Sequence, residues 1–106
     1  MPKYMLQASY TSEGVKGLLK EGGTKRHAAA KALVESLGGK LESLYFAFGD
    51  QDAVSIVDLP DASAAAAASL ALSASGLVRG RITVLLTPEE LDRASKKSPS
   101  YTPPGR

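Results

Sequence analysis

The chain has 106 residues, 43% hydrophobic and 23% charged, with a formal net charge of +2. This length fits one domain of about 100–150 residues, and the composition is typical of a globular chain. Cysteine is absent and His27 is the only histidine, which excludes disulfides, thiol catalysis and cysteine metal sites; no metal site is expected. The sequence contains neither a signal-peptide pattern nor an apolar run of about 18 residues, so we expect a cytoplasmic protein that binds no membrane.

The positive charge is concentrated at the end of the chain. Residues 93–106 hold four basic residues and no acidic one, whereas the rest holds nine basic and eleven acidic residues, a net charge of −2. A nucleic-acid-binding domain is expected to carry a basic face on its folded part. We therefore expect no nucleic-acid partner. We also expect one domain over residues 1–96, with residues 97–106 as a disordered, basic, Pro-rich tail.

The first third of the chain predicts a strand followed by a helical region. Residues 3–10 alternate between two kinds of side chain, which is typical of a strand. Residues 12–37 carry apolar residues at helical spacing, and Gly38-Gly39 ends the pattern. Gly22-Gly23 interrupts the pattern, and each glycine costs about 1 kcal/mol relative to alanine in a helix interior. We therefore expect a kink or short break there.

The middle of the chain predicts a β-hairpin. Residues 40–48 alternate as a strand, and residues 53–59 are rich in valine and isoleucine. Gly49-Asp-Gln-Asp52 lies between them and has the composition of a turn.

The last third predicts a helix, a strand and a short helix. Asp61 is a good N-cap for the alanine-rich segment 62–74. Residues 77–86 predict the fourth strand. Thr87-Pro-Glu-Glu90 is a capping box with proline at the first helical position, and it starts a helix that ends near Ser95.

The element order β-α-β-β-α-β predicts an α+β, ferredoxin-like antiparallel sheet with its helices on one face. The other face is then solvated or covered by a partner. The side chains expected under the helices are Tyr4, Leu6, Ala8, Leu44, Phe46, Phe48, Val54, Ile56, Ile82, Val84 and Leu86. Those expected on the opposite face are Met5, Gln7, Ser9, Leu41, Ser43, Tyr45, Ala47, Ser55, Val57, Arg79, Arg81, Thr83 and Leu85.

The opposite face is too apolar for a solvated surface and too polar for a plain core. Such a mixture suits a sheet that meets a second sheet around a lined cavity. The alternative is an interface in which these groups only bond across subunits. A desolvated Arg81 needs a carboxylate from a neighbouring subunit or an anionic ligand. The candidate ligand-binding residues are Gln7, Ser9, Ser43, Tyr45, Arg81 and Thr83.

The hairpin segment from Gly38 to Asp61, GGKLESLYFAFGDQDAVSIVDLPD, resembles the GYD domain family. Tyr4–Thr11 and Leu85–Glu90 resemble it too, so the resemblance covers about residues 3–91. It implies a small bacterial domain of the dimeric α/β-barrel type, in which two ferredoxin-like sheets face each other.

The family's turn motif is matched only in part. The family has Gly-x-Tyr-Asp at the hairpin; Gly49 and Asp52 fit, whereas Gln51 replaces the tyrosine. Gly49 and Asp52 also have a purely structural explanation, because glycine supplies unusual backbone angles in turns and aspartate caps turn amides.

Three hypotheses about function follow. The first is a homo-oligomer that holds a small organic ligand between facing sheets, with no cofactor and itself as its only protein partner. The second is a cofactor-independent enzyme of the monooxygenase or isomerase type that uses the same cavity. The third is an assembly module without a ligand. No catalytic residue is predicted, and a lone helical histidine such as His27 is more often a surface or packing residue than a base or a haem ligand.

Overall fold

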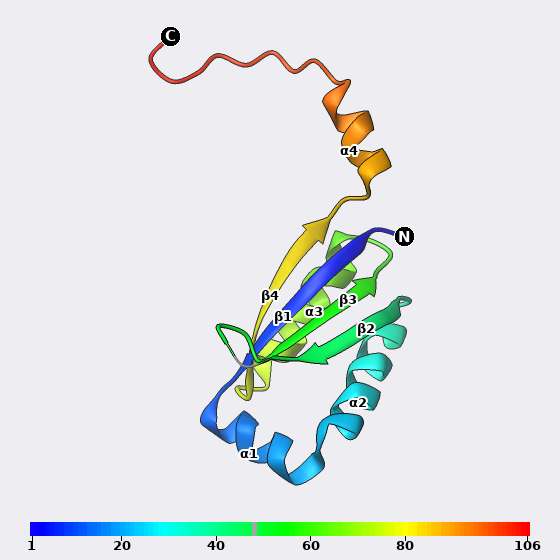
Figure 1. Ribbon diagram of the computed structural model, residues 1–106, viewed down its shortest axis with the longest axis vertical. Helices are drawn as coiled ribbons and strands as arrows, with labels where there is room; N and C mark the ends of the chain where they lie inside the picture. The colour runs from blue at the N-terminus through cyan, green and yellow to red at the C-terminus, as the bar shows by residue number, and fades with distance from the viewer. Residues whose placement is uncertain (48) are drawn as a thin grey trace.

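In the computed structural model, residues 1–47 and 49–106 are described, and they form one antiparallel sheet with four helices (Figure 1). The strands are β1 (Lys3–Tyr10), β2 (Lys40–Phe46), β3 (Ala53–Asp58) and β4 (Val78–Leu85), in the order β2-β3-β1-β4 across the sheet. The helices are α1 (Ser12–Glu21), α2 (Gly23–Ser36), α3 (Ala62–Ala74) and α4 (Pro88–Ser95). The chain order and the antiparallel pairing confirm the expected α+β, ferredoxin-like fold.

Gly22 divides the first helical region into α1 and α2, as expected. Its φ of +86° is a conformation that glycine adopts without steric cost, and its N–H donates to the Leu18 carbonyl at 2.8 Å. The apolar residues of the two helices differ in burial. Val34 of α2 is buried, whereas Leu19 of α1 is 80% exposed. The core is therefore supplied by α2 rather than by α1.

The two faces of β3 are the reverse of the expected ones. The register with β1 places Ser55 opposite Leu6, so Ser55 and Val57 lie on the helix side. Val54 and Ile56, expected under the helices, lie on the other face. Alternation alone does not distinguish the faces of this strand, because valine occurs in both sets.

A β-bulge in β2 causes a second difference from expectation. The bulge lies between Leu41 and Ser43, and the extra residue shifts the alternation. Leu41, expected on the outer face, therefore lies on the helix side with Leu44, while Ser43 and Tyr45 lie on the outer face as expected. Phe48, expected under the helices, lies outside the described residues.

The core is an apolar cluster at one end of the helix side, where the second half of α2 and the start of α3 meet the sheet. Its buried members are Tyr4, Leu6, Val34, Val57, Leu59 and Ala65. Asp61 caps α3 at this end, as expected. Its carboxylate accepts from the Ala64 N–H at 2.9 Å, and this bond lowers the pKa of Asp61 below its ordinary value.

The last helix, α4, stands away from the sheet, and none of its residues is buried (Figure 1). Its capping box is confirmed: the Thr87 N–H donates to Glu90 Oε1, and the Glu90 N–H donates to Thr87 Oγ1, both at 3.1 Å. Val84 and Leu86, expected under the helices, are 62% and 57% exposed, because the chain leaves the body of the domain here. Leu91 on α4 is also exposed. The end of the chain thus carries apolar side chains that nothing covers in the isolated molecule.

Residues 97–106 contain no helix or strand. Among the described residues, none of the helices has the length and apolar character that a membrane crossing requires.

Candidate functional site: the open face of the sheet

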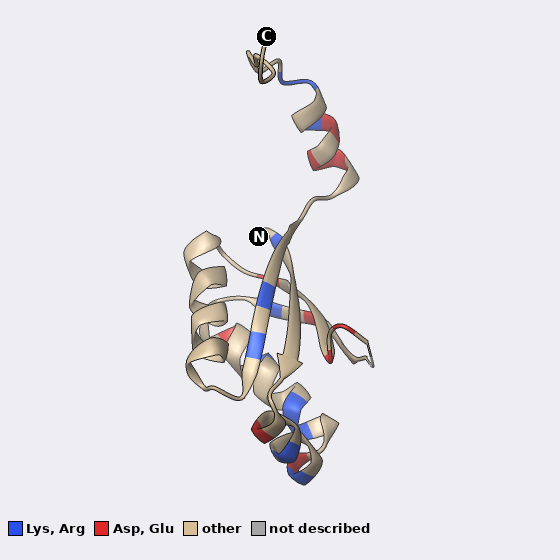
Figure 2. Cartoon of the chain, turned by 90° about the vertical axis from the view of Figure 1, so that its left-hand side faces the viewer, with Lys and Arg blue, Asp and Glu red and all other residues tan. Residues whose placement is uncertain are grey.

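One face of the sheet carries no helix. Figure 2 shows α3 on one side of the sheet and the β2–β3 loop projecting on the other side. We term that second side the open face. The strand register places on it Lys3, Met5, Gln7, Ser9, Lys40, Ser43, Tyr45, Val54, Ile56, Asp58, Arg79, Arg81, Thr83 and Leu85. All six predicted ligand-binding residues lie on this face.

Two adjacent rows of side chains cross the open face from β2 to β4. The first row is Ser43, Ile56, Met5 and Thr83. The second row is Tyr45, Val54, Gln7 and Arg81. Both rows have polar groups on the edge strands and an apolar residue from β3 near the middle. The face therefore has an apolar centre with hydrogen-bonding groups on both sides.

The register brings some of the predicted residues together and keeps others apart. Gln7 lies directly opposite Arg81, so their Cβ atoms are about 5 Å apart. Tyr45 lies three strand spacings from Arg81, about 14 Å across the sheet. Ser43 and Thr83 are separated in the same way. A ligand that contacts both edges must therefore span the apolar centre.

The Lys3 ammonium group links three strands at one end of the open face. Its Nζ lies 2.9 Å from Asp58 Oδ1 on β3 and 3.4 Å from Glu42 Oε1 on β2. The hydrogen bond to Asp58 raises the pKa of Lys3 above its ordinary value, because it favours the charged ammonium form. These charges compensate one another, so this group forms a polar boundary at that end of the face.

The β2–β3 loop forms the boundary at the other end. Asp52 Oδ2 accepts from the Tyr10 backbone N–H at 2.8 Å, and the Asp52 N–H donates to the Ala8 carbonyl at 2.8 Å. Asp52 therefore fastens the loop to the end of β1 rather than capping amides of its own turn. Gln51, at the position of the family's tyrosine, accepts from the Ser9 hydroxyl at 3.2 Å. The amide thus contacts one of the predicted ligand-binding residues.

Gly49 is exposed in the β2–β3 loop, and a Cβ added there would meet nothing within 4 Å. Close packing among the described residues therefore does not require glycine at this position. The explanation of Gly49 by unusual backbone angles stays a prediction.

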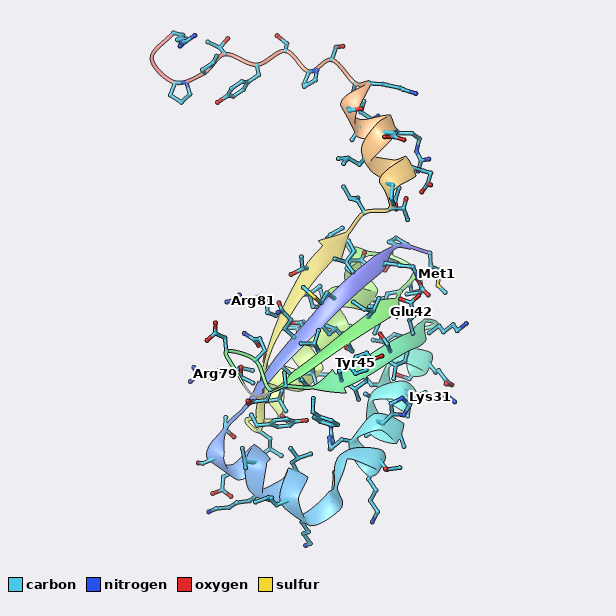
Figure 3. The ribbon with its side chains drawn as sticks, in the orientation of Figure 1. Met1, Lys31, Glu42, Tyr45, Arg79 and Arg81 are labelled. Atoms are coloured by element: carbon cyan, nitrogen blue, oxygen red, sulfur yellow. The ribbon has the colours of Figure 1, made fainter. Side chains whose placement is uncertain are left out.

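The β4 edge carries the two arginine side chains of the open face. Figure 3 shows Arg79 and Arg81 extending beyond this edge, while Tyr45 comes from β2, the strand at the opposite edge of the sheet. Arg79 and Arg81 are exposed, and among the described residues neither has a carboxylate within ion-pair distance. Tyr45 is 72% exposed. Guanidinium groups in this setting bind carboxylates or phosphates well.

The chemistry of the open face is that of an amide, hydroxyls, a phenol and two guanidinium groups. These groups donate and accept hydrogen bonds and pair with anions. In the described chain, no three His, Cys, Asp or Glu side chains come close enough together to hold a metal ion. His27 is exposed on α2, which does not contribute to this face.

The residues that sequence reasoning missed lie on the opposite side of the sheet. A cavity between α2 and the sheet is lined by Arg26, Ala30 and Ser55, among others. Ser55 was expected on the outer face, and Arg26 was not predicted to bind a ligand. The available signal was the pair of small residues, Ala53 and Ser55, at alternate positions of β3, since small side chains on an inner face leave space under a helix.

Comparison with known proteins identifies a family. The family model described as GYD domain matches residues 4–95, which is most of the chain, so the chain belongs to the GYD domain family. No curated protein and no solved structure matches it.

Proposed function

We propose that this member of the GYD domain family associates with a second copy through the open face and holds a small organic ligand between the two facing sheets. The observation that carries this proposal is the arrangement of β3. Val54 and Ile56 point to the open face, while Ala53, Ser55 and the fully buried Val57 point to the helices. A solvated sheet face is normally polar. An uncovered face that takes two large apolar residues of a central strand favours burial by a partner.

The size of the face is consistent with a second copy. A sheet of four strands of about eight residues measures about 19 Å by 26 Å, or roughly 500 Å². Stable interfaces bury about 800 Å² on each partner, so the sheet alone is somewhat small. The exposed side chains of Leu86 and Leu91 beside and on α4 offer further apolar surface. Contact of α4 with the second copy would bring the interface into the usual range.

The polar groups of the face favour a ligand with an anionic or strongly polar group. Burial of Arg81 by a second sheet would remove it from water, and an unpaired buried guanidinium is strongly destabilising. A ligand carboxylate or phosphate on Arg81, with Gln7 beside it, satisfies this requirement. Ser43, Tyr45 and Thr83 then provide further hydrogen bonds around the apolar centre.

The second candidate function is an assembly module in which the two sheets meet without a ligand. The apolar centre formed by Met5, Val54 and Ile56 favours this function as well. Here Arg81 would pair with a carboxylate of the second copy. Both functions require self-association, and they differ in whether the assembly carries an additional molecule.

Sedimentation-velocity ultracentrifugation of two matched variants tests the shared requirement. Ile56→Lys places a charge at the centre of the open face, whereas Leu70→Lys places one on α3, where Leu70 is 69% exposed. We expect the wild type and Leu70→Lys to sediment as dimers or larger species, and Ile56→Lys to sediment as a folded monomer. A wild-type monomer, or equal association of all three proteins, would contradict the proposal.

A further inference from the structure

A cavity lies on the helix side of the sheet, on the opposite surface from the open face. Its volume is about 90 Å³, below the roughly 300–1,000 Å³ of most small-molecule sites, so a ligand held there must be small. Its lining comes from α2, the sheet and α3 and includes Arg26, Ala29, Ala30, Ala53, Ser55 and Leu72. The cavity adjoins the core cluster, because Leu6 and Val34 belong to the cluster and also line the cavity.

The shape of this space follows from the side chains around it. The core end is filled by large residues such as Val57 and Leu59, which are fully buried. Toward the other end, α2 presents Ala29 and Ala30 to the small side chain of Ala53 on β3. Alanine side chains are too short to fill the distance between a helix and a sheet, which is about 10 Å in packed layers. An apolar cleft therefore remains.

Ser55 places an unused polar group on the floor of the cavity. The residue is 7% exposed, and its hydroxyl has no hydrogen-bond partner among the described residues. Among the described residues, no side-chain nitrogen or oxygen atom is both shielded from solvent and without a hydrogen-bond partner. The Ser55 oxygen therefore opens into the cavity. A hydroxyl in this position stays unsatisfied unless water or a ligand bonds to it.

Arg26 places a positive charge at the mouth. It is half-buried, and it lines both this cavity and an adjoining groove beside α1. Its only ion-pair partner in the described chain is Glu21, through Nη1 and Oε2 at 3.5 Å, which is a long contact. Guanidinium has five N–H donors in a planar fork, so most of its capacity is still available for a second carboxylate.

The geometry points to a binding site for a small apolar carboxylic acid. The carboxylate pairs with Arg26 at the mouth, the apolar body lies between α2 and the sheet, and a hydroxyl or carbonyl group at the far end bonds to Ser55. Uncharged apolar molecules lack the ion pair with Arg26. Inorganic anions lack the apolar body and the hydrogen bond to Ser55. The site is independent of the open face and of any second copy of the chain.

NMR titration of the ¹⁵N-labelled protein tests this proposal with three matched probes: 4-hydroxycinnamate, cinnamate, which lacks the far hydroxyl, and 4-hydroxycinnamamide, which lacks the charge. We expect saturable shifts of the Ala29 and Ala30 amides with 4-hydroxycinnamate, and weaker binding of the other two. Shifts confined to open-face amides such as Thr83 would place the acid in the other site and overturn the inference. The absence of saturable shifts would overturn it as well.

Variants separate the contributions of the lining residues. Arg26→Gln is expected to weaken 4-hydroxycinnamate binding about tenfold and to leave 4-hydroxycinnamamide unchanged. Lys31→Gln is the matched control, because it removes the same charge from an exposed position on α2. Ser55→Ala should weaken 4-hydroxycinnamate and not cinnamate, and Ala30→Leu should block all three probes by filling the cavity. Equal loss in Arg26→Gln and Lys31→Gln would show general charge attraction and would contradict the proposed site.

Discussion

Replacement of Asp52 is expected to loosen the hairpin loop from β1 and to destabilise the whole domain. The Asp52 carboxylate accepts from the Tyr10 N–H at 2.8 Å, across 42 positions of sequence. A hydrogen bond to a charged group contributes about 1.5–3 kcal/mol. Because both residues are half-buried, we expect the lower half of this range for Asp52→Ala, about 1.5–2 kcal/mol. Asp52→Asn keeps a hydrogen-bond acceptor and should lose less free energy of unfolding than Asp52→Ala.

The assay is equilibrium urea unfolding followed by far-UV circular dichroism, at one fixed protein concentration. Asp50→Ala is the matched control, because Asp50 is exposed and only its backbone carbonyl contacts Ser9. We expect the free energy of unfolding of Asp50→Ala to remain within about 0.5 kcal/mol of the wild-type value. For Asp52→Ala we expect a lower midpoint with an unchanged m-value, and a Tm lower by roughly 6–10 °C. Equal stability of the two variants would refute the assigned role of Asp52.

Three further predictions concern glycines and the last helix. Gly17→Ala should stabilise α1 by about 0.5–1 kcal/mol, because a Cβ there meets nothing within 4 Å. Gly14→Ala should destabilise the protein, because its Cβ would overlap the backbone carbonyl of Leu77. In thermal unfolding we expect a higher Tm for Gly17→Ala and a lower Tm for Gly14→Ala. Gly49→Val should weaken self-association in sedimentation, because Gly49 lies in the loop at the boundary of the open face and an added side chain there meets nothing within 4 Å among the described residues. The hydrogen bond from the Thr87 N–H lowers the pKa of Glu90. The stabilisation of α4 by Glu90 is therefore complete above the ordinary pKa of a glutamate and is lost as the pH falls through the lowered pKa. Cα chemical shifts of α4 between pH 7 and 3 should show this loss of helix, and the Glu90→Gln variant should lack this pH dependence.

Local chemistry made the helices predictable. The φ of +86° at Gly22 and the reciprocal bonds between Thr87 and Glu90 follow from residues within one turn of each other. Such features depend on backbone freedom and side-chain reach, which a sequence states directly. The element order then leads to the antiparallel sheet.

The faces of β2 and β3 were harder to predict because they depend on distant partners. In β2, one extra residue between Leu41 and Ser43 shifts the alternation, and periodicity contains no sign of it. In β3, Val54 and Val57 are equally apolar, so the choice of face is made by pairing with β1. Asp58, which bonds Lys3 on the open face, was the one signal in favour of the observed choice.

The candidate sites were predicted to different degrees. The open-face residues of β1 and β4 followed from alternation, and Gln7 and Arg81 are indeed neighbours across the sheet. The Asp52 contact with Tyr10 and the cavity around Ser55 depend on how the loop and α2 lie against the sheet. Those positions result from packing of the whole chain, which single-sequence patterns do not specify.

Native mass spectrometry of freshly purified protein, under conditions that keep non-covalent complexes, tests whether a second copy covers the open face and whether a ligand lies between the sheets. We expect a dimer or larger species that carries a discrete additional mass, and that mass would indicate the class of the ligand. A dimer without additional mass would favour the assembly module. A monomer with an uncovered open face would contradict the proposed self-association.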